Sequence, residues 1–287
     1  MSAHNEAILL IHCPDKPGII AAVTRYILKH GGNILDLDQH TDSVKQKFYM
    51  RVSWVLNEFD IENGEIEESF EREIAKQFEM NWSLHFTSKR QKLALLVSKQ
   101  QHCLFDILAR WQTKEWEVDI PLIISNHEEV RDTANKFGIE FHHLPITKEN
   151  KIEQEAKQIE LIKEKNIDLI VLARYMQILS SNFIESFRNQ VINIHHSFLP
   201  AFPGARPYHS AYERGVKIIG ATSHYVTEEL DEGPIIEQDI VHVTHRDDVG
   251  SLVRKGRDLE TLVLSRAVWK HIQRKTLVTA NRTIIFN

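Results

Sequence analysis

Short, uninterrupted apolar runs in the second half of the chain constrain the fold more than any other feature of this sequence. LALLVS (93–98) and DLIVLA (168–173) lack polar alternation, which is typical of strands buried on both faces of a parallel sheet. The segments that alternate with them are helical patterns at 101–113, 127–136 and 148–165 and strand patterns at 118–125 and 140–144. This order predicts a doubly wound, mostly parallel α/β sheet, with ligands at the carboxyl ends of its strands.

The first part of the chain has a different pattern. Its segments read in order as a strand (EAILLIHC), a helix (IIAAVTRYILK), two strands joined by a turn (NILDLDQHTD and QKFYMRVSWVL), a helix at 65–79 and a strand (NWSLHFT). The order βαββαβ is the ferredoxin-like pattern. We therefore expect a small domain at 1–87, a polar linker SKRQK at 88–92, and a larger catalytic domain at 93–287.

Composition excludes several classes of function. The net charge is -5, whereas nucleic-acid-binding proteins usually present a basic face. No apolar run approaches the ~20 residues of a membrane helix, and the N-terminus lacks the basic start of a signal peptide. Cys13 and Cys103 are far apart in sequence, as expected for two reduced thiols. We expect a cytoplasmic protein that binds neither nucleic acid nor membrane.

The stretch VINIHHS (191–197) places polar side chains at the end of a buried strand. Asn193 and His195 are two residues apart, so they share one face of the strand. An amide N–H can stabilise a developing oxyanion, and an imidazole can hold or pass a proton near neutral pH. Asp231 precedes a Gly-Pro turn and is a candidate to orient His195 and favour its charged form. On pattern alone, such a pair is also typical of ordinary polar residues at a strand end.

Other cofactor and metal motifs are absent from the sequence. No G-x-G-x-x-G, phosphate-binding G-x-x-x-x-G-K-[ST] or G-x-S-x-G pattern is present. The side chains that could ligate a metal are His195, His196, His209, Glu213, His242 and His245, and their spacing matches no zinc motif. We expect no metal and no bound cofactor, and we interpret His196 as structural.

Three long motifs resemble one known family. LARYMQILS (172–180), NIHHSFLPAFPG and GATSHYVTEELDEGPIIEQD are similar to the folate-dependent formyltransferases, which transfer the formyl group of 10-formyltetrahydrofolate. The resemblance covers roughly 90–270 and implies catalytic roles for Asn193, His195 and Asp231. It also implies a folate pocket lined by Leu172, Met176, Ile178, Leu179, Val226 and Leu230. Plain core packing is the alternative interpretation of these apolar residues.

The segment DKPGIIAAVTRYILKHGGNILDLDQH resembles the start of an ACT domain, a regulatory module that often binds amino acids. The resemblance implies a ligand site at the first strand-helix turn, formed by Asp15, Gly18, Ile19, Asn33 and Ile34. Gly18 has no Cβ, so a ligand carboxylate can approach the backbone there. Glycine or methionine is the expected effector, and at least a homodimer is expected. The alternative is a module that only dimerises.

The members of this family differ in the acceptor of the formyl group, and one loop bears on which acceptor the resemblance implies here. SKQQHCLF, after the first strand of the larger domain, is too bulky to wrap a phosphate with backbone N–H groups. An ACT-like module joined to a formyltransferase-like domain implies water as acceptor, with formate and tetrahydrofolate as products. Formate would then supply purine synthesis and balance one-carbon pools. Two alternatives remain: formyl transfer to a small amine, and a binding protein without turnover.

Overall fold

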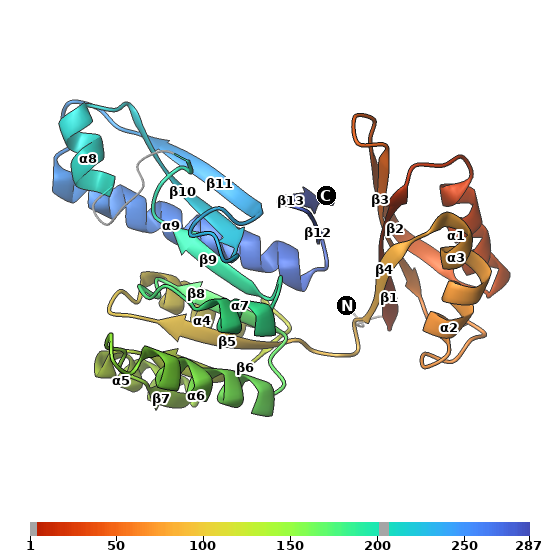
Figure 1. Ribbon diagram of the computed structural model, residues 1–287, viewed down its shortest axis with the longest axis horizontal. Coiled ribbons are helices and arrows are strands. Elements are labelled where there is room, and N and C mark those ends of the chain that lie inside the picture. Colours follow the sequence, from red (N-terminus) through yellow and green to blue (C-terminus); the bar gives the residue numbers. More distant parts are fainter. Residues whose placement is uncertain (1–4, 201–206) are drawn as a thin grey trace. The chain divides into compact units, whose positions relative to one another are not determined.

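The computed structural model describes residues 5–200 and 207–287, which form two compact units (Figure 1). The first comprises the residues up to Arg90 together with Arg274–Leu277 and Ile284–Asn287. The second comprises Gln91–Gln273 and Val278–Thr283. The expected bounds of 1–87 and 93–287 therefore differ from the structure at the linker and at the C-terminus.

The first unit has the predicted ferredoxin-like order. Its elements are β1 (Glu6–Pro14), α1 (Ile19–Lys29), β2 (Asn33–Asp42), β3 (Lys47–Val55), α2 (Ile66–Phe70), the π-helical turn η1 (Glu71–Ala75), α3 (Lys76–Phe78) and β4 (Asn81–Phe86). The four strands form an antiparallel sheet in the order β2-β3-β1-β4. Ile66, Phe70, Ile74 and Phe78 are buried, as their helical spacing predicts.

The C-terminal residues of the chain contribute to the core of the first unit. Leu277 lies in β12 (Thr276–Thr279), and Phe286 directly follows β13 (Arg282–Ile285), the second strand of the same hairpin. These two side chains form an apolar cluster with Leu10 and Tyr49. The expected domain bounds missed this because the hairpin is separated from its packing partners by more than 200 positions of sequence.

The second unit contains a seven-stranded sheet in the order β11-β10-β9-β8-β5-β6-β7. Its strands are β5 (Lys92–Val97), β6 (Asp119–Ser125), β7 (Glu140–His143), β8 (Leu169–Ala173), β9 (Val191–His195), β10 (Ile218–Tyr225) and β11 (Ile235–His242). The first five are parallel, whereas β10 and β11 are antiparallel additions at one edge. The predicted doubly wound, mostly parallel sheet is confirmed.

Helices cover both faces of this sheet (Figure 1). They are α4 (His102–Gln112), the short 3₁₀ turn η2 (Glu128–Val130), α5 (Arg131–Phe137), α6 (Lys151–Glu164), α7 (Ser181–Ser186), α8 (Pro207–Arg214) and α9 (Val249–Ile272). Helices α6 and α7 pack on the Ala94 and Leu96 side of β5. Helices α4 and α9 contact each other, and α9 also lies along β9, β10 and β11.

Among the described residues, no helix combines the length and the apolar character that crossing a membrane requires.

Candidate active site

A pocket of about 390 Å³ lies at the carboxyl ends of β8 and β9. This is the edge at which parallel α/β sheets bind their ligands. All nine catalytic and substrate-binding residues expected from the sequence line this pocket: Asn193, His195, Asp231, Leu172, Met176, Ile178, Leu179, Val226 and Leu230. The structure therefore brings together residues from three segments of the chain.

His195 and Asp231 form the central pair. His195 is buried, and its Nδ1 lies 3.2 Å from Oδ2 of Asp231. His195, followed by the nearby His224, holds the pKa of the Asp231 carboxyl well below its usual range, although partial burial opposes the shift. The other ring nitrogen of His195, Nε2, is buried and has no hydrogen-bond partner in the part of the chain that the structure describes. The pair thus fixes the ring and leaves Nε2 available to a ligand.

Asn193 is oriented by a histidine that the sequence interpretation missed. His224 lies opposite Asn193 in the β9-β10 ladder, and its Nδ1 is 2.9 Å from the carbonyl oxygen of Tyr225. Because a carbonyl only accepts, Nδ1 donates to Tyr225, which leaves Nε2 to accept from an amide N–H. Nδ2 of Asn193 lies 3.3 Å from that Nε2. One amide N–H therefore points to His224, which leaves the second N–H for the pocket.

The loop that carries Asp231 depends on close backbone packing. Asp231 has a φ of 58°, in the left-handed region that non-glycine residues seldom adopt. Two residues later, a Cβ on Gly233 would lie 1.8 Å from the carbonyl oxygen of Tyr225. The predicted Gly-Pro turn thus places the loop against the end of β10, where Tyr225 N also donates to the carbonyl of Pro234 at 2.9 Å.

The apolar wall of the pocket is partly exposed. Met176 is 52% exposed, and Ile178 and Leu230 are each 61% exposed. Leu172 and Leu179, in contrast, belong to the buried core under α6 and α7. Core packing therefore accounts for Leu172 and Leu179 and in part for Val226, which packs against the same cluster. The exposed side chains of Met176, Ile178 and Leu230 provide an apolar surface on which a flat heterocycle can pack.

Buried polar groups hold the segment 174–180 in place. The hydroxyl of Ser98, at the end of β5, accepts from the backbone N–H of Met176 at 3.1 Å. Both carboxylate oxygens of the buried Glu155 accept from the backbone N–H of Ser180, at 3.2 and 3.3 Å. The pocket wall therefore rests on a rigid support from β5 and α6.

A second buried polar cluster adjoins the pocket and was not found from the sequence. Glu260 of α9 is 1% exposed, and it contacts Nε2 of His102 at 2.7 Å and the hydroxyl of Tyr208 at 2.6 Å. Burial opposes ionisation of Glu260, but these hydrogen bonds and the charge of Arg174 hold its pKa below the ordinary value. One feature of the sequence could have indicated this cluster. Arg174, a charged residue, directly follows a buried strand within LARYMQILS.

One group of potential metal ligands occurs among the described residues, namely His102, Cys103 and Glu260. It shares no member with the candidates considered from sequence. Burial raises the pKa of the Cys103 thiol well above its usual value, and a thiol must be deprotonated to ligate. The adjacent Arg174 also competes as a cation for Glu260. This donor set does not fit a metal centre.

The residues expected to hold a regulatory ligand lie in different environments. Gly18 precedes α1 with a φ of 93°, and Ile19 is buried in the core of the first unit. Asp15 and Asn33 are exposed, and Ile34 is half-buried. The structure thus leaves the backbone of this turn accessible, but not the side chain of Ile19.

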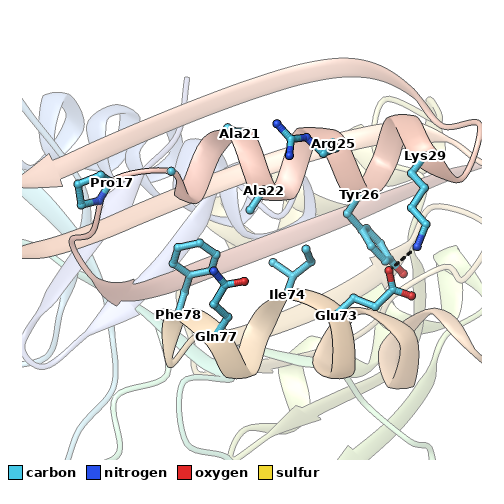
Figure 2. Close-up of a pocket in the computed structure, with 11 residues that line it drawn as sticks. Pro17, Ala21, Ala22, Arg25, Tyr26, Lys29, Glu73, Ile74, Gln77 and Phe78 are labelled. Atoms are coloured by element: carbon cyan, nitrogen blue, oxygen red, sulfur yellow. Dashed lines mark hydrogen bonds and ion pairs between the residues drawn. The ribbon is translucent and has the colours of Figure 1, made fainter.

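A separate groove of about 490 Å³ runs between α1 and the segment Glu73–Phe78, and of the five expected residues only Gly18 lines it. Figure 2 shows Ala21 and Ala22 facing Ile74, Gln77 and Phe78 across this groove. An ion pair between Lys29 and Glu73, 2.7 Å long, lies at one end (Figure 2). The small alanine side chains leave part of the space between the two helices unfilled here.

Comparisons with known proteins agree with both units. A formyl transferase family model matches residues 91–268, and an ACT domain model matches residues 7–75. A formyltetrahydrofolate deformylase of Synechocystis is 55% identical over 98% of each chain, and one of Bacillus subtilis is 46% identical over 97% of this chain and 93% of its own. The crystal structure of a formyltetrahydrofolate deformylase from Pseudomonas syringae superposes with a TM-score of 0.97 at 41% identity, covering 100% of this chain and 96% of the other.

Proposed function

This chain belongs to the formyltetrahydrofolate deformylase family, and from that membership we propose how its pocket hydrolyses 10-formyltetrahydrofolate to formate and tetrahydrofolate. The observation that supports the proposal is the placement of Asn193, His195 and Asp231 around one pocket with an exposed apolar wall. The pterin lies along Met176, Ile178 and Leu230, and the formyl group lies beside Asn193 and His195.

The chemistry starts with attack of water on the formyl carbon. The free N–H of Asn193 donates to the oxygen that becomes negative, a contact worth about 3 kcal/mol in comparable sites. Nε2 of His195 takes the proton of the attacking water, and Asp231 stabilises the resulting imidazolium. The imidazolium then protonates N10 of the folate as the carbon-nitrogen bond breaks, which releases formate and tetrahydrofolate.

Asp231 orients His195 and does not act as the base itself. The sequence left open whether the proton moves through Asp231 or through His195. The lowered pKa of Asp231 makes its carboxylate a weak base, which favours His195 for this role. Asp231 keeps the proton of His195 on Nδ1 and so presents the lone pair of Nε2 to the water.

The first expected result concerns the product and the absence of a cofactor. We propose that the reaction needs neither a metal nor a bound cofactor, since the one cluster of potential metal ligands in the described residues is engaged by Arg174 and Tyr208. Purified protein treated with a chelator and given 10-formyltetrahydrofolate alone should release formate and tetrahydrofolate in equal amounts. Both products are assayed together, with and without added zinc.

The result also separates the alternatives. Folate binding without product release, followed by consumption of the formyl group when a small amine is added, would replace hydrolysis by transfer. The comparisons do not favour that outcome, because the relatives named above carry the name deformylase. Loss of activity in the chelator, restored by zinc, would contradict the proposal of a metal-free reaction.

We further propose that the first unit binds a small amino acid, with glycine or methionine as the expected ligand, at the turn formed by Asp15–Ile19. No side chain caps the start of α1, and the backbone at Gly18 is open to a carboxylate. One of the two amino acids should raise the melting temperature and change the hydrolysis rate. Substitution Gly18→Val should weaken this response, whereas Leu28→Ala, exposed on the same helix, should leave it unchanged.

Such ACT-type sites commonly form where two copies meet, so we propose a homo-oligomer. Light scattering at several concentrations, with and without the amino acid, measures the mass of the particle. A monomer that responds normally to the amino acid would contradict the oligomer and retain the ligand site. If neither glycine nor methionine changed the melting temperature or the hydrolysis rate, the proposal of amino-acid regulation would be wrong.

We also propose that the protein acts in the cytoplasm, where its formate supplies purine synthesis. Cys13 and Cys103 are both unpaired and buried, as expected for a reducing compartment. Deletion of the gene should then create a requirement for formate or purines under conditions in which formate has no other source. Growth without either supplement would remove the metabolic part of the proposal but not the enzymatic part.

A further inference from the structure

Arg174 is a buried cation in the wall of the catalytic pocket. It directly follows β8, is only 7% exposed, and lines the same pocket as His195. Its φ of 63° lies in the left-handed region, where backbone strain is often kept for a functional purpose. The guanidinium is charged at all ordinary pH values and carries five N–H donors.

The contacts of Arg174 leave part of this donor capacity unused. Its Nε lies 3.4 Å from Oε2 of Glu260, within ion-pair distance but without hydrogen-bond geometry. Its Nη2 lies 3.4 Å from the side-chain oxygen of Gln100. Nη1 is buried and has no hydrogen-bond partner among the described residues. A buried, charged donor without a partner is costly, so an acceptor is expected to complete this site.

Glu260 does not supply the acceptor that Nη1 of Arg174 lacks, because its carboxylate also interacts with other side chains. The same carboxylate accepts from the hydroxyl of Tyr208 and contacts His102. Arg174 therefore shares Glu260 with two other groups, and the Nη1 edge of the guanidinium remains available.

The guanidinium of Arg174 and the pair His195–Asp231 act on the same neighbouring side chain, His196. The ring of His196 lies 5.2 Å from that of His195 and also lines the pocket. Burial, followed by the charges of Arg174 and His195, lowers the pKa of His196 to about 4. His196 is therefore neutral at pH 7 and adds no positive charge beside Arg174. Among the described residues that line this pocket, Nε2 of His195 is a further buried nitrogen without a hydrogen-bond partner.

We infer that Arg174 binds the carboxylate product, formate, as it leaves the reaction centre, an inference that rests on the proposed hydrolysis. A guanidinium edge matches the two oxygens of a small planar carboxylate. An anion formed beside His195 is attracted to Nη1 of Arg174, which moves it away from the tetrahydrofolate nitrogen. The enzyme is consequently inhibited by its own product through Arg174.

The test compares formate binding by the full-length wild-type protein with that by Arg174→Gln. Sodium formate is titrated at constant ionic strength, with sodium chloride as reference, and the inhibition constant is measured together with the line width of ¹³C-formate. Arg174→Gln should weaken formate binding by ~10–100-fold, the effect of losing a charge-assisted hydrogen bond. Arg257→Gln, which removes an exposed arginine from α9, is the charge-matched control.

Two further measurements keep the test decisive. Arg174→Lys retains the charge that neutralises Glu260, so it separates formate binding from folding if Arg174→Gln is unstable. In the wild-type protein, the ¹⁵N side-chain signal that Arg174→Lys removes should shift with formate. Equal formate affinity in wild type and Arg174→Gln, or no binding by the wild type up to ~100 mM formate, would overturn the inference. Formate binding is read without folate, so a failure of hydrolysis does not obscure it.

Discussion

Substitution His195→Ala should lower kcat by about 10³-fold or more while changing KM little. A positioned acid-base group contributes typically about 10²–10⁴-fold, and His195 lines the pocket with an Nε2 that has no hydrogen-bond partner among residues 5–200 and 207–287. Steady-state kinetics with 10-formyltetrahydrofolate measure the effect. His242→Ala, an exposed histidine on β11, is the matched control and should retain full activity.

Asp231→Asn tests the other half of the pair. An amide can present its N–H to Nδ1 of His195, which favours the wrong tautomer, so kcat should fall by at least about 10²-fold. Because the two residues act as a unit, the double substitution should cost little more than His195→Ala alone. A His195→Ala enzyme that keeps more than a tenth of its kcat would remove His195 from the mechanism.

The pH dependence of stability gives a second measurement on the same variants. The pKa of Asp231 is lower in the folded state than its unfolded value of about 3.9, so ionised Asp231 stabilises the fold above that pH. This contribution is lost as the pH falls below about 4 toward the lower folded-state pKa. Unfolding free energies of wild type and Asp231→Asn should therefore differ at pH 7 and converge at strongly acid pH.

Substitution Gly233→Ala should disable the site without touching any reacting group. The added Cβ would lie 1.8 Å from the backbone oxygen of Tyr225, and neither partner is a flexible side-chain end that can move away. The loop that carries Asp231 must shift, and a misplacement of about 1 Å can cost about 10²-fold in rate. Thermal unfolding should also report a loss of about 1–3 kcal/mol, as overpacking does.

Gly250→Ala provides the control for this substitution. Gly250 lies in α9, where an added Cβ meets Asp248 at an ordinary 3.5 Å. Alanine in a helix is favoured over glycine by up to about 1 kcal/mol, so the variant should be as stable as the wild type or slightly more stable. Normal activity in Gly233→Ala would mean that Asp231 is not positioned by this close packing.

Local patterns predicted most of the fold. The uninterrupted apolar runs at 93–98 and 168–173 became β5 and β8 of the parallel sheet, and the βαββαβ order of the first unit was readable from alternation and helical spacing. These patterns are local, since they reflect which side of each element faces a core. The π-helical turn at Glu71–Ala75 was not predictable, because it alters hydrogen bonding without changing the buried face.

The pocket residues were predictable to different degrees. Asn193 and His195 are marked by their position at the end of a buried strand, and the long motifs supplied Asp231 and the apolar wall. His224 was missed because its role depends on being opposite Asn193 in the ladder, which a single segment does not reveal. The roles of these residues in catalysis remain predictions that the substitutions above test.

The sequence by itself determined the two kinds of sheet and the order of their elements, because periodicity depends on neighbours within one segment. Only the tertiary structure decided that Leu277 and Phe286, near the C-terminus, pack with Leu10 and Tyr49 in the first unit. It also decided that Arg174, His102 and Glu260 meet beside the pocket. Those contacts join residues up to 158 positions apart, and burial of their charges is possible only once the whole sheet and α9 enclose them.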